Sequence, residues 1–569
     1  MTVLAEAKPC VTTQTARPEP VEGLAPGWAR VSITEISHSM GGGTPSKSDA
    51  SYWTAGTVPW VSPKDMKSFH IISSEDAVTE SALKQLSVIP TNSVLLVVRS
   101  GILSHTLPVG LNALPVTINQ DMRAFVAARE ISARYLAWQL VSRGREILSA
   151  CSKDGTTVAS IEAPALARFP LTLAPAAEQT RIVEKLEELL SDLDAGVAEL
   201  KAAQKKLTQY RQSLLKAAVE GVLTADWRGQ RTVATPSSRG RGTGRGYRLN
   251  APSPLSPHPL PNPPPQREGT CETGAQLLER ILKERRVRWQ AKQLAKFKEQ
   301  GKAPPKDWQH KYPEPVKPDT TDLPPLPEGW VWASAEQLCD FITKGTTPPK
   351  EFDGSGEKVI PFLRVTNLSD GGEMNMNDKV FVSKSTHDGF LARSAVYPGD
   401  VLMNIVGPPL GQVSVVPATF PEWNINQAIA IFRAVDGVLP SYVCLNLLSP
   451  LAQYWLKARA KTTAGQSNLT LETCRSLPIP LPSEAEQQAL VQAADVAINA
   501  IDGQVRAIQH ALKHSDAQRK NILKAAFSGQ LVPQDPNDEP ASVLLTRIRA
   551  ERAAGAATAK APKPKKIAV

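Results

Sequence analysis

Side chains that could contact the edges of nucleic-acid bases recur along this chain between short apolar runs. Arginine, asparagine and glutamine present paired hydrogen-bond donors or acceptors; in duplex DNA arginine suits guanine, and the two amides suit adenine. These residue types therefore predict base contacts. The candidates are Lys64, Arg99, Ser100, His105, Asn119 and Gln120 in the first half, and Arg364, Thr366, Asn367, Asn404, Asn424, Asn426 and Gln427 in the second.

Each candidate also has a structural explanation. A single asparagine commonly forms a turn, and a single arginine is commonly solvated. The pair Asn119-Gln120 returns as Asn426-Gln427. This recurrence fits a shared structural turn slightly better than recognition, and the sequence leaves both open.

Two further features allow the same two interpretations. Trp28 and Trp330 could stack on bases, but their position at the start of both halves favours a core anchor. The stretch 276–311 holds eleven Lys/Arg and four Asp/Glu. It could neutralise phosphates or form a solvated helix face; its arginines and first lysine are Arg280, Lys283, Arg285, Arg286 and Arg288.

Catalytic and metal-binding patterns are missing from the sequence, so we predict neither catalytic nor metal-ligating residues. There is no GxxxxGK[ST], Gly-x-Ser-x-Gly or His-Glu-x-x-His, which would mark a phosphate loop, a nucleophile or a zinc site. The six cysteines form no CxxC pair, which disfavours structural zinc and disulfides. No apolar run approaches the roughly 20 residues of a membrane span, and the sequence predicts a cytoplasmic protein.

The chain repeats itself, and the elements that position the candidates follow from the repeat. Residues 24–28 return at 326–330, and Gly43-Thr44 returns at 345–346. Farther along, residues 216–223 return at 524–531. A third match, 275–281 with 541–548, has an offset of 266 instead of 308. The first half therefore carries extra residues before this match. The Gly- and Pro-rich segment 232–270 is predicted to be these residues, in the form of a disordered insertion.

Each half divides into two kinds of structure. Residues 27–170 and 329–480 show short apolar runs broken by Gly, Pro and Asn, typical of strands in a mixed α/β domain. Residues 178–220 and 486–528 lack proline and carry an apolar heptad stripe, which predicts two long helices that pair as a coiled coil. The alternative is an ordinary packed helix. The predicted pairing residues are Val183, Leu186, Leu190, Leu193, Val197, Leu200 and Leu207, and Val491, Ile498, Ile501, Val505, Ile508 and Leu512.

This duplicated order of mixed domain and long helix resembles the specificity subunit of a type I restriction–modification enzyme over about residues 24–231 and 273–550. The shared features are Leu-x-x-Gly-Trp at the start of each half, the segments 99–108 and 118–121, and in the second half 462–469 and 477–482 before Glu486-Gln487. The second-half segment 462–469 contains a glycine motif. In the corresponding segment of the first half, 153–157, the glycine lies two residues out of register.

The resemblance implies an α+β fold: two tandem mixed α/β target recognition domains, each followed by a long helix, with the two helices paired as an antiparallel coiled coil. It implies that each domain reads one half of a bipartite target in double-stranded DNA. The helices would set the spacing and bind two methyltransferase subunits, which restriction subunits then join. S-adenosylmethionine, ATP and Mg would serve those partners, with no cofactor in this chain. A standalone DNA-binding protein and a self-contained restriction or methylation enzyme are the alternatives.

The expected boundaries combine the repeat with this resemblance. They are a disordered tail at 1–23, the first target recognition domain at 24–175, the central long helix and its end at 176–231, the disordered insertion at 232–272, a basic helix and linker at 273–325, the second target recognition domain at 326–482, the distal long helix and a C-terminal helix at 483–550, and a disordered basic tail at 551–569.

Overall fold

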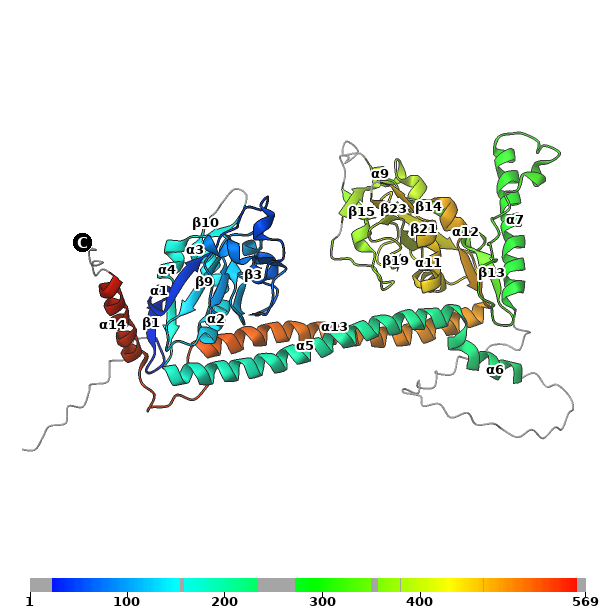
Figure 1. Ribbon diagram of the computed structural model, residues 1–569. Coiled ribbons are helices and arrows are strands. Elements are labelled where there is room, and N and C mark those ends of the chain that lie inside the picture. Colours follow the sequence, from blue (N-terminus) through cyan, green and yellow to red (C-terminus); the bar gives the residue numbers. More distant parts are fainter. Residues whose placement is uncertain are drawn as a thin grey trace, which may run out of the picture. The chain divides into compact units, whose positions relative to one another are not determined.

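The computed structural model describes residues 23–153, 158–233, 272–348, 357–378, 380–463 and 465–559. The chain forms two compact units: unit 1 is Met1–Lys201 with Ile508–Val569, and unit 2 is Ala202–Ala507 (Figure 1). Residues 1–22 of the predicted tail and 234–271 of the predicted insertion lie outside the described residues.

The α/β domain of unit 1 is built on a five-stranded sheet in the order β2-β9-β6-β7-β4. Residues 94–97 are buried on both faces, as a run of Val and Leu predicts for a central strand. The sheet strands are β2 (Ser37–Gly41), β9 (Met122–Ala127), β6 (Val94–Val97), β7 (Val109–Asn112) and β4 (His70–Ile71); the others are β1 (Ala29–Ser32), β3 (Val58–Val61), β5 (Asp76–Val78), β8 (Thr117–Ile118), β10 (Ser152–Lys153), β11 (Ser160–Ile161) and β12 (Pro170–Leu173).

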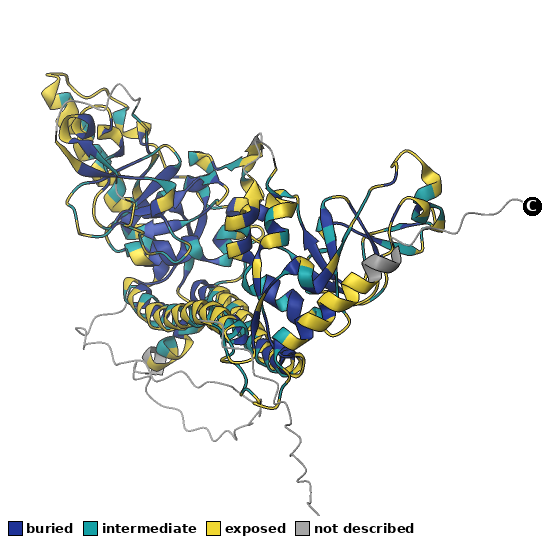
Figure 2. Cartoon of the chain, turned by 90° about the vertical axis from the view of Figure 1, so that its left-hand side faces the viewer, coloured by how far each residue is buried: buried dark blue, intermediate teal, exposed yellow. Residues whose placement is uncertain are grey.

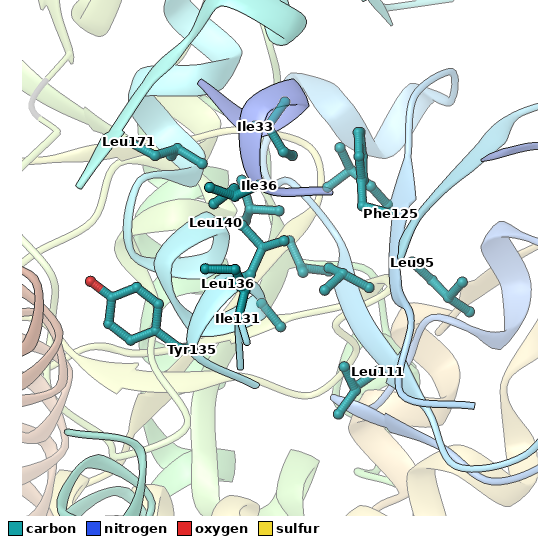
Figure 3. Packing of buried hydrophobic residues seen from close by; sticks show 14 of the residues in the cluster. Ile33, Ile36, Leu95, Leu111, Phe125, Ile131, Tyr135, Leu136, Leu140 and Leu171 are labelled. Carbon is teal, nitrogen blue, oxygen red and sulfur yellow. The ribbon is translucent and has the colours of Figure 1, made fainter. Parts of the chain in front are cut away.

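Helices cover this sheet and close its core. Ile33 and Ile36 come from α1, Leu136 and Leu140 from α2, and they meet Phe125 of β9 in one apolar cluster (Figure 3). All of these side chains are buried. The helices are α1 (Ile33–Ile36), α2 (Ala133–Ser142), α3 (Gly144–Cys151) and α4 (Ala163–Arg168).

The α/β domain of unit 2 repeats this topology. Its four-stranded sheet β14-β21-β17-β19 corresponds to β2-β9-β6-β7, and its sheet β16-β15-β20 corresponds to β5-β3-β8. The pairs β3–β8 and β15–β20 are both parallel. The strands are β13 (Val331–Ser334), β14 (Cys339–Lys344), β15 (Lys358–Leu363), β16 (Val380–Ser383), β17 (Val401–Asn404), β18 (Val406–Gly407), β19 (Val413–Val415), β20 (Asn424–Ile425), β21 (Ile429–Ala434), β22 (Lys461–Thr463), β23 (Gln466–Asn468) and β24 (Pro478–Leu481).

The two ends of the unit 2 domain are joined in the same way as those of the unit 1 domain. The pair β13–β24 joins the two ends of the domain, as β1–β12 does in unit 1. The duplication predicted from the sequence is therefore present as two equivalent folds. The helices are α8 (Ala335–Leu338), α9 (Lys384–Asp388), α10 (Pro440–Leu448), α11 (Pro450–Arg459) and α12 (Leu471–Ser476).

The two predicted long helices are present as α5 (Ala176–Val219) and α13 (Glu484–Phe527), with 44 residues each. Gly221 and Gly529 follow their ends with φ of 72° and 74°, the left-handed conformation that ends many helices. The predicted pairing residues are all buried or half-buried, whereas both helices also carry broad exposed surfaces (Figure 2).

Shorter helices follow each long one: α6 (Ala225–Val233) and α7 (Gly274–Glu299) after α5, and α14 (Ala541–Ala559) after α13. The predicted C-terminal tail at 551–569 is wrong for its first nine residues, because alanine-rich sequence continues α14 to Ala559. Over the described residues, no helix is both long and apolar enough to cross a membrane.

Candidate DNA interface

A repeated tryptophan fixes the start of each α/β domain to the start of the long helix that follows it. Trp28 Nε1 donates to Glu178 Oε2 at 3.0 Å, and Trp330 Nε1 donates to Glu486 Oε2 at 2.9 Å. Both tryptophans are buried. The core-anchor interpretation is therefore confirmed, and neither ring offers a face for stacking on a base.

The two carboxylates have different surroundings. Burial raises the pKa of Glu178, against the opposing effect of its Trp28 hydrogen bond. Glu486 also pairs with Arg228 and accepts from Thr224 Oγ1 at 2.7 Å.

The glutamine that follows each of these glutamates ties the long helix to a second helix start. Gln179 Oε1 accepts from the Ser132 backbone N–H just before α2, at 3.0 Å. Gln487 Oε1 accepts from the Leu439 N–H just before α10, also at 3.0 Å. Sequence reasoning saw Glu-Gln only as a repeated marker; the structure shows that it positions the domain.

The repeated Asn-Gln pair is a structural turn. Asn119 Oδ1 accepts from the Asp121 N–H at 3.1 Å, and Asn426 Oδ1 accepts from the Ala428 N–H at 3.2 Å. Gln120 and Gln427 instead are exposed. The turn interpretation is confirmed for the asparagines.

Glycines pack directly against these turns. A Cβ on Gly42 would lie 2.2 Å from the Asn119 carbonyl oxygen, and a Cβ on Gly345 would lie 2.2 Å from that of Asn426. Beside them, Thr44 donates to Gln120 and Thr347 to Gln427. The equivalent glycines are thus Gly42 and Gly345, one residue away from the match that the sequence suggested.

Three other asparagine candidates, like Asn119, are buried. Asn367 Nδ2 donates to the Asn375 and Asp378 carbonyls, and Asn424 Nδ2 donates to His387 Nδ1. Asn404, the last residue of β17, donates to the Pro409 carbonyl. Because their amides are enclosed and serve these internal bonds, we correct the candidate interface by removing Asn119, Asn367, Asn404 and Asn424.

The remaining candidates of the first domain are partly or fully accessible. Arg99 is exposed and forms an ion pair with Asp121 at 2.9 Å. Ser100 Oγ accepts from the Ile102 N–H at the start of the short 3₁₀ turn Gly101–Ser104, and His105 directly follows this turn. Exposed Lys64 lines a surface pocket with neighbours up to Glu75.

In the second domain, Arg364, Thr366, Asn426 and Gln427 are accessible. Arg364 is half-buried and pairs with Asp378. The structure brings Arg364 and Thr366 together around one 3₁₀ turn, Val365–Asn367, and places Asn426 beside Leu363 through a 3.0 Å backbone hydrogen bond.

In the basic stretch 276–311, the arginines form ion pairs or hydrogen bonds, whereas Lys283 is exposed. Arg280 pairs with Glu272 and Arg288 with Asp340, each at 2.9 Å. Arg286 pairs with Glu314, and Arg285 donates to two backbone carbonyls. Four of the five residues named from the sequence therefore hold the fold, and Lys283 is exposed.

The cysteines and the possible metal ligands of the described residues can be placed directly. Cys151, Cys339, Cys444 and Cys474 are buried free thiols, and burial raises the pKa of each thiol. No group of three or more His, Cys, Asp or Glu side chains among the described residues could hold a metal ion.

Known proteins are similar to this chain in sequence. The specificity subunit of the type I restriction enzyme EcoR124I/EcoR124II from Escherichia coli is 41% identical over 188 residues, which cover 32% of this chain and 46% of that protein. The EcoBI specificity subunit from Escherichia coli is 26% identical over 412 residues, 70% of this chain and 68% of that protein.

A solved structure, described as the structural basis of complex assembly and conformational transition of the type I R-M system, shares the fold. Its TM-score is 0.57 at 18% identity, covering 90% of this chain and 100% of that chain. The family model for the type I restriction modification DNA specificity domain matches residues 26–202 and again residues 327–509. The chain therefore belongs to the type I restriction modification DNA specificity family and carries two copies of its domain.

Proposed function

We propose that this chain is the DNA-recognition subunit of a type I restriction–modification complex, with one recognition domain for each half of a bipartite target. The observation that carries this proposal is the double match to the specificity-domain family, which falls on two domains of equivalent topology. The chain itself is non-catalytic. It recruits two methyltransferase subunits and the restriction subunits in the cytoplasm of a bacterium or archaeon, and S-adenosylmethionine, ATP and Mg act in those partners.

Covalent duplication explains how an asymmetric site is read. A symmetric dimer presents identical readers and fixes the separation of two identical half-sites. Two copies within one chain can diverge independently, and here they differ most between residues 60 and 160 of the first half. Each domain then recognises its own sequence.

We propose further that α5 and α13 pair as an antiparallel coiled coil. Asp194 of α5 pairs with Arg519 of α13 in unit 1, and Arg211 of α5 pairs with Asp502 of α13 in unit 2. Seventeen residues forward along α5 thus correspond to seventeen residues backward along α13. This register, together with the buried or half-buried stripe on both helices, supports pairing in which helix length sets the separation of the half-sites.

Base contact is proposed for the accessible candidates. A side chain must be at least partly accessible to enter a DNA groove, and the amide or guanidinium must be able to leave its present partner. Arg99 and Arg364, whose ion-pair partners are at least partly exposed, meet both conditions. The proposed set is Lys64, Arg99, Ser100, His105 and Gln120 in the first domain, and Arg364, Thr366, Asn426 and Gln427 in the second. Asn426 stays in the set because its turn hydrogen bond uses the Oδ1 atom and its side chain is only half-buried.

The test is methylation mapping in cells that express this chain together with the methyltransferase and restriction subunits of the same organism. We expect a split methylated motif that disappears when this chain is deleted. A contiguous motif, or methylation that persists without the chain, would refute the proposal. Methylation by the isolated chain with S-adenosylmethionine would instead support a self-contained enzyme, and specific DNA binding without copurifying methyltransferase would support a standalone DNA-binding protein.

A further inference from the structure

The helix α7 continues beyond the part that packs on the α/β domain of unit 2, and the chain that follows it turns back toward that domain. After α7 ends at Glu299, the chain passes through a 3₁₀ turn at Trp308–Lys311 and returns to the domain. There the Val316 N–H donates to Glu336 at 2.9 Å. We call residues 289–312 the arm; Figure 1 shows α7 running beside β13 with a loop beyond its end.

The first half of α7 has a counterpart in α14. The Gly274 N–H donates to the Gly329 carbonyl at 2.7 Å, and the Ala541 N–H donates to the Gly27 carbonyl at 2.8 Å. Equivalent residues of α7 and α14 are therefore 267 positions apart in the structure, one more than the offset of 266 that the sequence match gave. Arg285 donates to the carbonyls of Glu336 and Cys339, and Arg552 donates to the equivalent carbonyls of Thr34 and Ser37. The shared part of the two helices therefore serves packing in both units.

The arm has no counterpart in this packing. At the same offset, Ala556 stands where α7 has Trp289, and α14 ends at Ala559, which corresponds to Lys292, whereas α7 continues to Glu299. The arm therefore exceeds the length that the two helices share.

Aromatic rings give the arm a defined shape. Trp289 stacks on Trp308 with ring centroids 5.8 Å apart and meets Tyr312 edge-on at 5.4 Å. Phe297 meets Trp308 at 6.1 Å. These contacts join the helix to the returning segment around Trp308–Lys311 and hold the lysines between them on one compact element.

The arm contains lysines that have no acidic partner. Six lysines and two carboxylates lie between residues 289 and 312. All six lysines are exposed, and none forms an ion pair within the part of the chain that the structure describes, in contrast to the arginines of α7. They are Lys292, Lys296, Lys298, Lys302, Lys306 and Lys311.

We propose that the arm binds the phosphate backbone of double-stranded DNA outside the recognition sequence. Unpaired lysines are mobile point charges, which suit contacts that neutralise phosphates and release counterions without reading bases. Arginine has a planar guanidinium that favours fixed geometry. Accordingly, Arg286 and Arg288, which directly precede the arm, form ion pairs with Glu314 and Asp340. This inference rests on the proposed function and adds a sequence-independent contact to it.

The test compares two double variants of the full chain, each in complex with its methyltransferase. Lys292→Gln with Lys296→Gln removes two charges one helical turn apart on the arm. Lys84→Gln with Lys457→Gln removes two exposed lysines elsewhere. Binding to duplex DNA that lacks the target is measured between 50 and 200 mM salt.

For the arm variant, we expect the slope of log K against log salt to become shallower by up to about 1.8, at about 0.9 per phosphate contact. The loss of affinity between 50 and 200 mM salt should therefore be up to about tenfold smaller than for the wild type, for target and non-target DNA alike. The control variant should keep the wild-type slope. Lys292→Arg with Lys296→Arg should also retain it.

An unchanged slope in the arm variant would overturn the proposal, and so would an equal change in the control, because net charge alone would then explain the effect. Loss of methyltransferase copurification with unchanged DNA binding would overturn it in favour of an acidic protein partner. If the wild-type complex methylates no split motif while the slope still falls, the proposed function fails and the arm's DNA contact stands.

Discussion

Lengthening both long helices by matched insertions should widen the unspecified gap between the two half-sites. The register from the Asp194–Arg519 pair places the junction of Val197 and Ala198 opposite the junction of Ser515 and Asp516. Four helix-forming residues inserted at both junctions add about 6 Å at about 1.5 Å per residue. With about 3.4 Å per base pair, from about 34 Å per ten-base-pair turn, the gap should grow by one to two base pairs.

The insertion should leave both half-sites unchanged. Four residues exceed the 3.6-residue turn by little, so the apolar stripe stays nearly in phase. Two-residue insertions at the same junctions are the control: they rotate the stripe by about 200° and should abolish pairing and methylation. Genome-wide methylation mapping measures the outcome. Full activity with the original gap in the four-residue variant would show that the helices do not set the spacing.

Four further outcomes follow from the domains and their buried groups. Exchanging residues 27–170 for the corresponding domain of another specificity subunit should alter one half-site only; a change in both, or in neither, would contradict independent reading. Asn424→Ala should lower the free energy of unfolding by about 1–3 kcal/mol because its amide bonds His387 and Ser394, while the methylated motif stays the same; an altered motif would restore Asn424 as a base reader. Burial raises the pKa of Glu178, so the folded state favours the protonated carboxyl, and the stability that this gives is lost as pH rises through the folded pKa. The Glu178→Gln variant should therefore melt at a higher temperature than the wild type at pH 7, and at the same temperature well below pH 4. A lower melting temperature of the variant at pH 7 would contradict this reasoning. Deleting residues 234–270 should leave complex assembly and methylation intact, and loss of either would assign that segment a structural role.

The sequence by itself determined the features that depend on residues close along the chain. The apolar stripe every three to four residues predicted both long helices within two residues of their ends, because helix periodicity is local. Repeated short motifs predicted the duplication, and repetition of Trp28 at Trp330 predicted a core anchor. Residues with a common role in both halves are visible without any knowledge of what they contact.

Tertiary structure decided which side chains are free to act. Asn424 and Gln427 are three residues apart and equally suited to adenine, yet Asn424 is enclosed against His387 and Gln427 is exposed. Likewise Arg288 is paired with Asp340, 52 residues away, whereas Lys292 on the same helix has no acidic partner among the described residues. Burial and ion pairing depend on elements distant in sequence, so residue type predicts what a side chain can bind and the fold determines whether it is available.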